Sequence, residues 1–275
     1  MTPVAARVGV FVLALVAGYG LVCAAAWLGQ RSLMYLPGRW SEAEARRANP
    51  GYEEVRFPSA DGVQLHGWLH RRETAPWTVI VFHGNAGNLA VQAALMEPFE
   101  AMGLQVLLFD YRGYGLSTGS PSEAGLLADG EAAAEYVTTN LGVPAARTVF
   151  YGKSLGTGVA VLLAARRPPG RLILESSFDS MVSVARAHYP WLPVRTLLRD
   201  RYDAASAIGA VRCPILFVHG GADEIVPIRL GRALYECAAG PKRFLEVPGA
   251  LHNTPPGAYP AVHLETLRAF LEPAP

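Results

Sequence analysis

The pentapeptide Gly152-Lys153-Ser154-Leu155-Gly156 limits the possible folds of this 275-residue chain more than any other segment. It has the G-x-S-x-G pattern of a nucleophile elbow, a sharp turn from a strand into a helix that exposes a serine hydroxyl at the edge of a sheet. Glycine is needed two residues before and two residues after the serine because the backbone passes too close there for a side chain. An ordinary glycine-rich turn has a similar composition, so the flanking segments must distinguish a nucleophile elbow from such a turn.

The segments on either side of the pentapeptide favour the elbow. Residues 147–150 are typical of a short strand, and residues 159–166 are typical of a helix. A helix that begins at this point directs its positive end toward the site, which favours an oxyanion.

Strand-like and helix-like segments alternate along most of the chain. Residues 53–57 and 63–70 alternate apolar and polar side chains around Asp61-Gly62, which predicts an antiparallel hairpin at one edge of a sheet. Further strands are expected at residues 77–83, 104–109, 147–150, 171–174, 214–219 and 242–247. Helices are expected at residues 41–49, 89–102, 121–140, 159–166, 228–237 and 259–271. This order predicts an α/β fold, with a mostly parallel sheet covered by helices on both faces.

An uncharged apolar run occupies residues 8–28. As a helix it would be about 31 Å long at ~1.5 Å per residue, enough to cross the hydrocarbon of a bilayer. A buried core helix is one alternative. A cleaved signal peptide is another, with Ala24-Ala25-Ala26 as the cleavage site, although the run exceeds the usual apolar length of ~7–15 residues.

We therefore expect residues 1–30 to form a retained signal anchor, a single-pass transmembrane helix, and residues 31–275 to form the catalytic domain. The charges that flank the apolar run do not fix its orientation. The working expectation is that the catalytic domain is extracytoplasmic.

Composition excludes some classes of function. The formal net charge of +1, without a basic patch that contains aromatic residues, gives no reason to expect binding to nucleic acid. The 3 cysteines form neither a C-x-x-C motif nor a zinc-like cluster with histidine, so neither a metal nor a cofactor is predicted.

A serine hydroxyl needs a base to take its proton and an acid to orient that base. After a nucleophile elbow the acid is expected first and the histidine second, each on a loop that follows a strand. Asp223 and His252 fit this order, because each follows a predicted strand closely. The carboxyl ends of parallel strands share an edge of the sheet, so these loops should meet Ser154 there.

Other residues compete for the same roles. Asp179 is the alternative acid, and Glu224, beside Asp223, is expected to point elsewhere. His263 lies in a predicted helix, which favours a structural role, and His219 ends a strand, which favours a local hydrogen bond.

A tetrahedral intermediate also needs two hydrogen-bond donors for its oxyanion. The backbone N–H of Leu155, directly after the serine, is one. Asn85, in the loop after the strand at residues 77–83, is the other candidate, since Gly84 and Gly87 would let that loop approach the substrate. His83 is expected to brace this loop.

With these segments in place, the chain resembles the α/β-hydrolase fold family, and within it the membrane-anchored Bem46-like branch of serine hydrolases. The resemblance rests on HGNAGN (83–88), DYRGYGLSTG (110–119), GKSLGTG (152–158), LESSFDSM (174–181), HGGADEIVP (219–227), the loop of His252, and the apolar run followed by RSLMYLP (31–37). It implies a triad of Ser154, Asp223 and His252, with Asn85 and Leu155 as oxyanion donors. Lys153 departs from the glutamine often found at its position, and no role is assigned to it.

The substrate is less constrained than the reaction. Only about 38 residues, 176–213, separate two of the predicted strands, so any cap is small. Its aromatic patch, residues 188–193, could form a lid, a wall for an acyl chain, or packing over an edge of the core. We expect an esterase or thioesterase that acts on small-molecule, lipid-like or acylated substrates. A serine aminopeptidase and a membrane-tethered binding protein without turnover are the alternatives.

Overall fold

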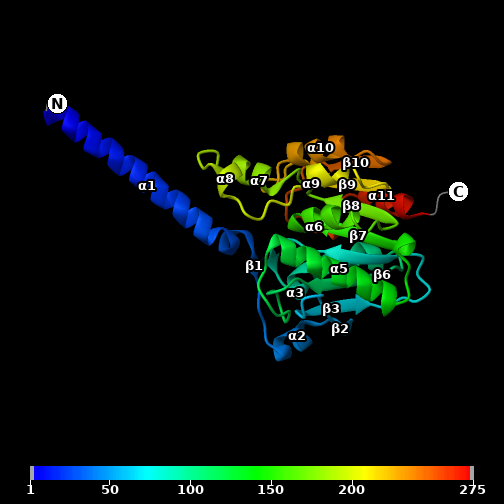
Figure 1. Cartoon of the computed structure of the whole chain (residues 1–275). Helices are drawn as coiled ribbons and strands as arrows, with labels where there is room; N and C mark the ends of the chain where they lie inside the picture. Colours follow the sequence, from blue (N-terminus) through cyan, green and yellow to red (C-terminus); the bar gives the residue numbers. More distant parts are fainter. Residues whose placement is uncertain (1–2, 273–275) are drawn as a thin grey trace.

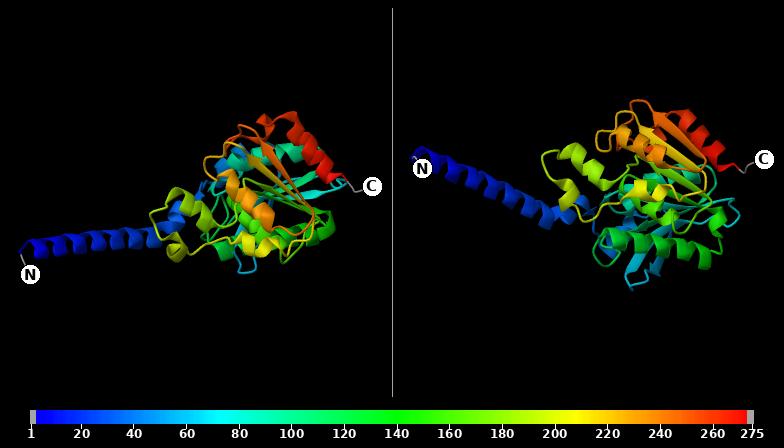
Figure 2. Two further views of the ribbon diagram at one scale, coloured as in Figure 1. Left: turned by 90° about the horizontal axis from the view of Figure 1, so that it is seen from above. Right: turned by 45° about the horizontal axis from the view of Figure 1, so that its top comes forward.

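The computed structural model describes residues 3–272 and contains within them an eight-stranded sheet and a separate pair of short strands (Figures 1 and 2). The order in the large sheet is β10-β9-β8-β7-β4-β6-β3-β2. Its strands are β2 (Glu53–Pro58), β3 (Gln64–His70), β4 (Thr78–Phe82), β6 (Gln105–Asp110), β7 (Thr148–Lys153), β8 (Arg171–Glu175), β9 (Ile215–Gly220) and β10 (Lys242–Val247). Strand β3 is antiparallel to β2 and β6, and all other neighbouring pairs are parallel. The predicted mostly parallel sheet with a hairpin at one edge is confirmed.

Most helices begin and end near their predicted positions. They are α2 (Glu42–Ala48), α5 (Glu123–Thr139), α6 (Leu155–Ala164), α10 (Ile228–Cys237) and α11 (Ala261–Leu271). The single helix predicted at residues 89–102 is wrong, because the structure has three short pieces: α3 (Leu89–Gln92), the 3-10 turn η1 (Ala93–Leu95) and α4 (Glu97–Glu100). Pro98 lies in the first turn of α4, where its missing N–H is tolerated; within a longer helix it would break the hydrogen-bond ladder.

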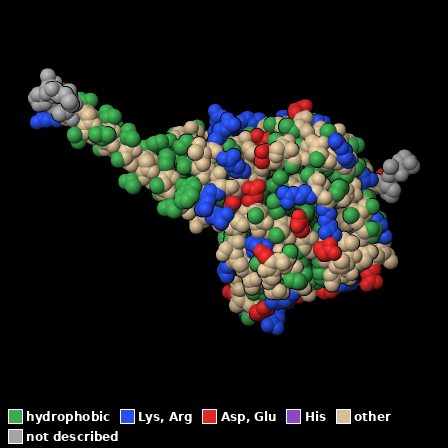
Figure 3. All heavy atoms as spheres, in the orientation of Figure 1, with side chains coloured by type: hydrophobic (Ala, Val, Ile, Leu, Met, Phe, Trp, Pro, Cys, Tyr) green, Lys and Arg blue, Asp and Glu red, His purple; other side chains and the backbone are tan. Residues whose placement is uncertain are grey.

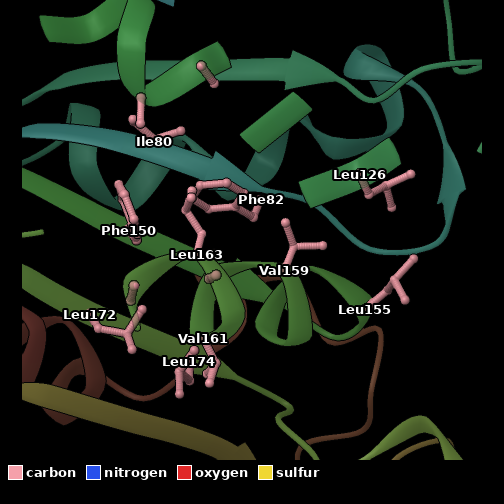
Figure 4. Close-up of a cluster of buried hydrophobic side chains, with 14 of the residues drawn as sticks. Ile80, Phe82, Leu126, Phe150, Leu155, Val159, Val161, Leu163, Leu172 and Leu174 are labelled. Carbon is pink, nitrogen blue, oxygen red and sulfur yellow. The ribbon is translucent and has the colours of Figure 1, made fainter. Parts of the chain in front are cut away.

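The core consists of two apolar layers, one on each face of the sheet. Ile80 and Phe82 of β4 face the same layer as Val159 and Leu163 of α6, together with Phe150 of β7 (Figure 4). The intervening residues of β4 point to the other layer, which α4 and α11 cover. This alternation explains why the strand is apolar at every position.

Helix α1 (Pro3–Met34) projects away from the sheet (Figures 1 and 3). Its segment Arg7–Met34 has a mean hydropathy of 2.4 over the most apolar window, and none of that window is buried inside the protein. A core helix would be largely buried, so that alternative does not fit. Length and composition suffice to cross a membrane. The helix continues without a break through residue 30, where the expected anchor ends. Residues 1–2 and 273–275 of the two expected domains lie outside the described part.

The chain after α1 runs directly to the sheet edge that carries the site. Strand β1 (Leu36–Pro37) pairs in parallel with β5 (Ala86–Gly87), which belongs to the loop after β4. Two-residue strands have no periodicity, so this pair was not predicted from the sequence.

The cap is formed by three short helices between β8 and β9: α7 (Met181–His188), α8 (Val194–Leu197) and α9 (Ala204–Ile208). In both Figures 1 and 2, α7 and α8 lie at the end of the domain from which α1 projects. Tyr189 and Trp191, in the connection between α7 and α8, are 50% and 58% exposed, so this aromatic patch does not pack over the core.

A buried ion pair fixes the loop after β6 to α5. The guanidinium of Arg112 donates to the fully buried carboxylate of Asp129 at 2.8 Å and to Asp61 in the hairpin turn at 2.7 Å. We predict that Arg112→Ala lowers the free energy of unfolding by about 3–5 kcal/mol, because Asp129 is left as an unpaired buried charge.

Urea unfolding of the full chain in detergent micelles measures this loss. Arg71→Ala, which breaks the exposed pair with Glu53, is the control and should cost no more than about 1 kcal/mol. Equal losses in the two variants would contradict the prediction.

Candidate active site

Ser154 lies in the turn between β7 and α6 with φ 52° and ψ −121°, a region that residues other than glycine rarely adopt. A Cβ at Gly152 would come within 2.7 Å of Gly156 and Thr157, and one at Gly156 would overlap the carbonyl of Phe82. The backbone therefore has the strain and the close packing that the G-x-S-x-G pattern predicts.

The strained turn is held from both sides. The N–H of Ser154 donates to the carbonyl of Glu175 at 2.9 Å, and the hydroxyl of Thr157 donates to the Ser154 carbonyl at 2.7 Å. The N–H of Leu155, the first residue of α6, belongs to the group of N–H donors that a helix leaves unpaired at its start. This donor points out of the positive end of the helix.

Asp223 and His252 meet at the carboxyl edge of the sheet. Nδ1 of His252 lies 2.9 Å from Oδ2 and 3.0 Å from Oδ1 of Asp223. An ionised carboxylate only accepts hydrogen bonds, so Nδ1 carries the proton and Nε2 is left as an acceptor. Both side chains are buried, which limits competition by water.

The loops that carry these two residues are joined by backbone hydrogen bonds. Gly221 N–H donates to the Val247 carbonyl at 2.9 Å, and Ala222 N–H donates to the Ala250 carbonyl at 3.0 Å. Glu224 points to the histidine loop, where its carboxylate accepts the backbone N–H of His252 at 3.2 Å. The acid and the histidine are thus positioned by one connected unit.

The pKa of Asp223 lies below its usual value. Burial alone would raise the pKa of this carboxyl, but the bonds from His252 and from the N–H of Val226 at 2.7 Å outweigh burial. Asp223 therefore remains ionised near neutral pH, which preserves the tautomer of His252.

The competing residues make other contacts, although His219 Nε2 also lies 3.5 Å from Oδ2 of Asp223. The carboxylate of Asp179 accepts a hydrogen bond from Ser183 at 2.6 Å, whereas His252 bonds Asp223. His219 is buried behind Asp223, and its Nε2 donates to the Val226 carbonyl at 2.8 Å, as a local bond. His263 is buried in α11 against Tyr259, with ring centroids 4.6 Å apart.

Asn85 lies in the loop after β4, beside the elbow. Its side-chain amide donates to the carbonyl of Met34 at 2.9 Å, so the backbone N–H is the group that could serve an oxyanion. Its carbonyl accepts the N–H of Leu36 at 2.8 Å and the hydroxyl of Tyr114 at 2.7 Å. A Cβ at Gly84 would stand 3.8 Å from the Cβ of Ser154, which shows how near this loop passes.

His83 braces the same loop, as its position in the sequence suggested. Its buried ring packs against Tyr111 with centroids 4.4 Å apart, and Nδ1 donates to the carbonyl of Gly84 at 2.7 Å. Burial lowers the pKa of His83 to about 4, so the ring is neutral at physiological pH.

A pocket of about 490 Å³ opens over Ser154. Apolar side chains dominate its walls, and none of its lining residues is acidic. One wall consists of Ala26, Gln30, Leu33 and Met34 from α1. The cap supplies further lining residues, which include Ala185, His188, Tyr189 and Leu192.

A buried network beside the elbow was not predicted from the sequence. Lys153 donates to the carboxylate of Glu175 at 2.7 Å, and the hydroxyls of Tyr151 and Tyr259 donate to it at 2.6 and 2.8 Å. Burial alone would raise the pKa of Glu175, but Lys153 and the two hydroxyls lower it below the usual value. The available signal was a lysine at the variable position of the motif, at a point where two strands end side by side.

No group of three side chains suited to hold a metal ion occurs among residues 3–272.

The strand order, the elbow, and the acid and histidine loops at one edge of the sheet define the α/β-hydrolase fold. Residues 78–207 match the α/β-hydrolase fold family. The chain is 43% identical to an uncharacterized protein of Mycobacterium tuberculosis, over 89% of this chain and 88% of that one. It is 33% identical to Bem46 of Schizosaccharomyces pombe, over 74% of this chain and 72% of that protein. A solved esterase of Pyrococcus furiosus has the same fold, with a TM-score of 0.68 at 19% identity, over 86% of this chain and 96% of that one.

These matches agree with the motifs on which the sequence-based resemblance rested. The chain belongs to the Bem46-like branch of the α/β-hydrolase family.

The depressed pKa of Asp223 predicts how stability depends on pH. A carboxyl whose pKa is lower in the folded state stabilises the fold above its unfolded pKa of about 4, and this stabilisation is lost as the pH falls. We predict that the drop in the free energy of unfolding between pH 6 and pH 3 is smaller in Asp223→Asn than in the wild type. Urea titrations at both pH values measure it.

Glu236→Gln, which changes an exposed carboxylate of α10, serves as the control. An unchanged drop in Asp223→Asn would show that the His252–Asp223 bond adds no pH-dependent stability.

Proposed function

We propose that this protein is a serine hydrolase that cleaves carboxylic ester or thioester bonds through an acyl-enzyme. Ser154 is the nucleophile, His252 the general base and Asp223 the residue that orients the histidine. The observation that carries this proposal is the bond between His252 Nδ1 and Asp223, because it leaves Nε2 unprotonated and able to accept a serine proton.

The proposed reaction has two halves. Ser154 Oγ attacks the substrate carbonyl carbon while His252 Nε2 takes its proton, and the backbone N–H groups of Leu155 and Asn85 bind the oxyanion that forms. The C–O or C–S bond then breaks, and His252 returns the proton to the leaving alcohol or thiol. Water, activated by the same histidine, releases the acid and restores Ser154.

The pocket favours substrates with an acyl chain. Its apolar walls suit hydrocarbon, and its volume of about 490 Å³ falls within the range of ~300–1,000 Å³ usual for small-molecule sites. An aminopeptidase must bind a substrate ammonium group, for which an acidic side chain is the usual partner, and the lining contains none. A protein without turnover would have no need for a histidine held in the base tautomer.

We further propose that α1 is retained as a single-pass anchor and that the domain beyond it is extracytoplasmic. Ala26, Gln30, Leu33 and Met34 line the site, which gives α1 a structural use beyond export. We predict that the mature protein in membranes keeps residues 1–30, and measurement of its intact mass tests this. Protease added to spheroplasts should then remove a C-terminal tag; a protected tag would place the domain in the cytoplasm.

Activity-based labelling tests the nucleophile. We predict that a fluorophosphonate probe labels the wild type, while Ser154→Ala and His252→Ala lose labelling and lose ester hydrolysis by roughly 10⁴-fold or more. Ser183→Ala, on α7, is the matched serine control and should label normally. Labelling that persists in Ser154→Ala would move the nucleophile to another residue.

A further inference from the structure

The end of α1 nearest the domain is tightly bound to the cap. The side chain of Gln30 donates to the Leu197 carbonyl at 3.1 Å and accepts the N–H of Arg199 at 2.7 Å. Arg31 forms a bidentate pair with Asp200, at 2.9 and 3.1 Å. These contacts fix the helix against the segment that follows α8.

The level of the membrane surface can be inferred from the side chains along α1. The guanidinium carbon of Arg199 lies 4.7 Å from the ring centroid of Trp27, and tryptophan and arginine are typical of the boundary between headgroups and water. From Trp27 back to Arg7 the helix extends about 30 Å, which matches the ~30 Å hydrocarbon thickness of a bilayer.

The cap extends beyond this level. The hydroxyl of Tyr19 donates to the carbonyl of Trp191, in the connection between α7 and α8, at 2.8 Å. Tyr19 precedes Trp27 by eight residues, which is about 12 Å along the helix. The connection at residues 189–193, which we call the cap loop, therefore reaches well into the depth of the hydrocarbon.

The composition and the hydrogen bonds of the cap loop suit that location. Its sequence, Tyr-Pro-Trp-Leu-Pro, carries no charge, and its two prolines have no N–H to satisfy. The N–H groups of Tyr189 and Leu192 donate to backbone carbonyls at 2.8 and 3.1 Å. Hydrocarbon tolerates a backbone only where such groups are paired, and in the cap loop the N–H of Trp191 and the carbonyl of Pro190 have no backbone partner.

The pocket over Ser154 lies between the same two elements. Ala26 of α1 and Tyr189 and Leu192 of the cap loop all belong to its lining. The α1 and cap-loop parts of the lining thus belong to the segments that the depth of Tyr19 places within the bilayer, and Ser154 lines the same pocket.

We infer that the cap loop is a second membrane-embedded element, and that the acyl chain of a bilayer lipid enters the active-site pocket between α1 and this loop. The acyl chain of the lipid does not cross water on this route. The second half of the inference rests on the proposed hydrolase function, whereas the embedded loop does not.

Fluorescence tests the loop. Full-length protein in phosphatidylcholine vesicles with brominated acyl chains should show tryptophan quenching that falls in Trp191→Phe. Trp77→Phe is the control, because Trp77 lies before β4, at the amino-terminal edge of the sheet away from the site. Quenching that is unchanged in Trp191→Phe overturns the inference.

Hydrolysis tests the route. Trp191→Asp puts a charge on the loop, and it should lower the ratio of p-nitrophenyl palmitate hydrolysis in vesicles to p-nitrophenyl acetate hydrolysis in water by about tenfold or more. Val262→Asp, at a site that is 56% exposed on α11, should leave this ratio unchanged. A ratio that does not fall in Trp191→Asp, in protein that melts at the wild-type temperature, overturns the route.

The two arms separate the two proposals. A wild type that hydrolyses neither ester and binds no fluorophosphonate contradicts the proposed hydrolase and with it the route, while the quenching result still decides whether the loop is embedded.

Discussion

The contact between the start of α6 and the end of β4 is the constraint on which the site depends. Gly156 lies so close to the carbonyl of Phe82 that no side chain fits between them. The same turn holds Ser154 at a positive φ, and a Cβ at Gly156 would also come within 2.7 Å of the carbonyl of His83, the residue after Phe82. Because the loop of Asn85 continues from His83, one steric contact sets the separation of the candidate nucleophile and the candidate oxyanion donor.

Buried polar groups around Glu175 hold the elbow in place. Glu175 uses its carbonyl to bind the elbow and its carboxylate to bind Lys153 and two tyrosine hydroxyls. A buried charge pair of this kind contributes little net stability, since desolvation offsets attraction. The four hydrogen-bond partners of Glu175, however, leave few other positions for the backbone at the elbow. The network therefore acts on the geometry of the elbow.

The sequence predicted those parts of the structure that depend on local pattern. The alternation around Asp61-Gly62 predicted the hairpin, and the spacing of Asp223 and His252 after their strands placed them in one cluster, because parallel strands end at a common edge. Features that arise from tertiary contact were not accessible. Strand β1 pairs with β5 across 50 residues of sequence, and Lys153 pairs with Glu175 across 22 residues. No local periodicity encodes these contacts.

The continuity between α1 and the site bears on how such a protein can be divided. The helix supplies a wall of the pocket, and the next residues, β1, form a parallel pair with the loop of Asn85. Helix and hydrolase domain are therefore not interchangeable modules. A chimera that exchanges α1 for an unrelated helix must retain about residues 26–37, and a version that begins at residue 31 would lack Ala26 and Gln30 of the pocket lining.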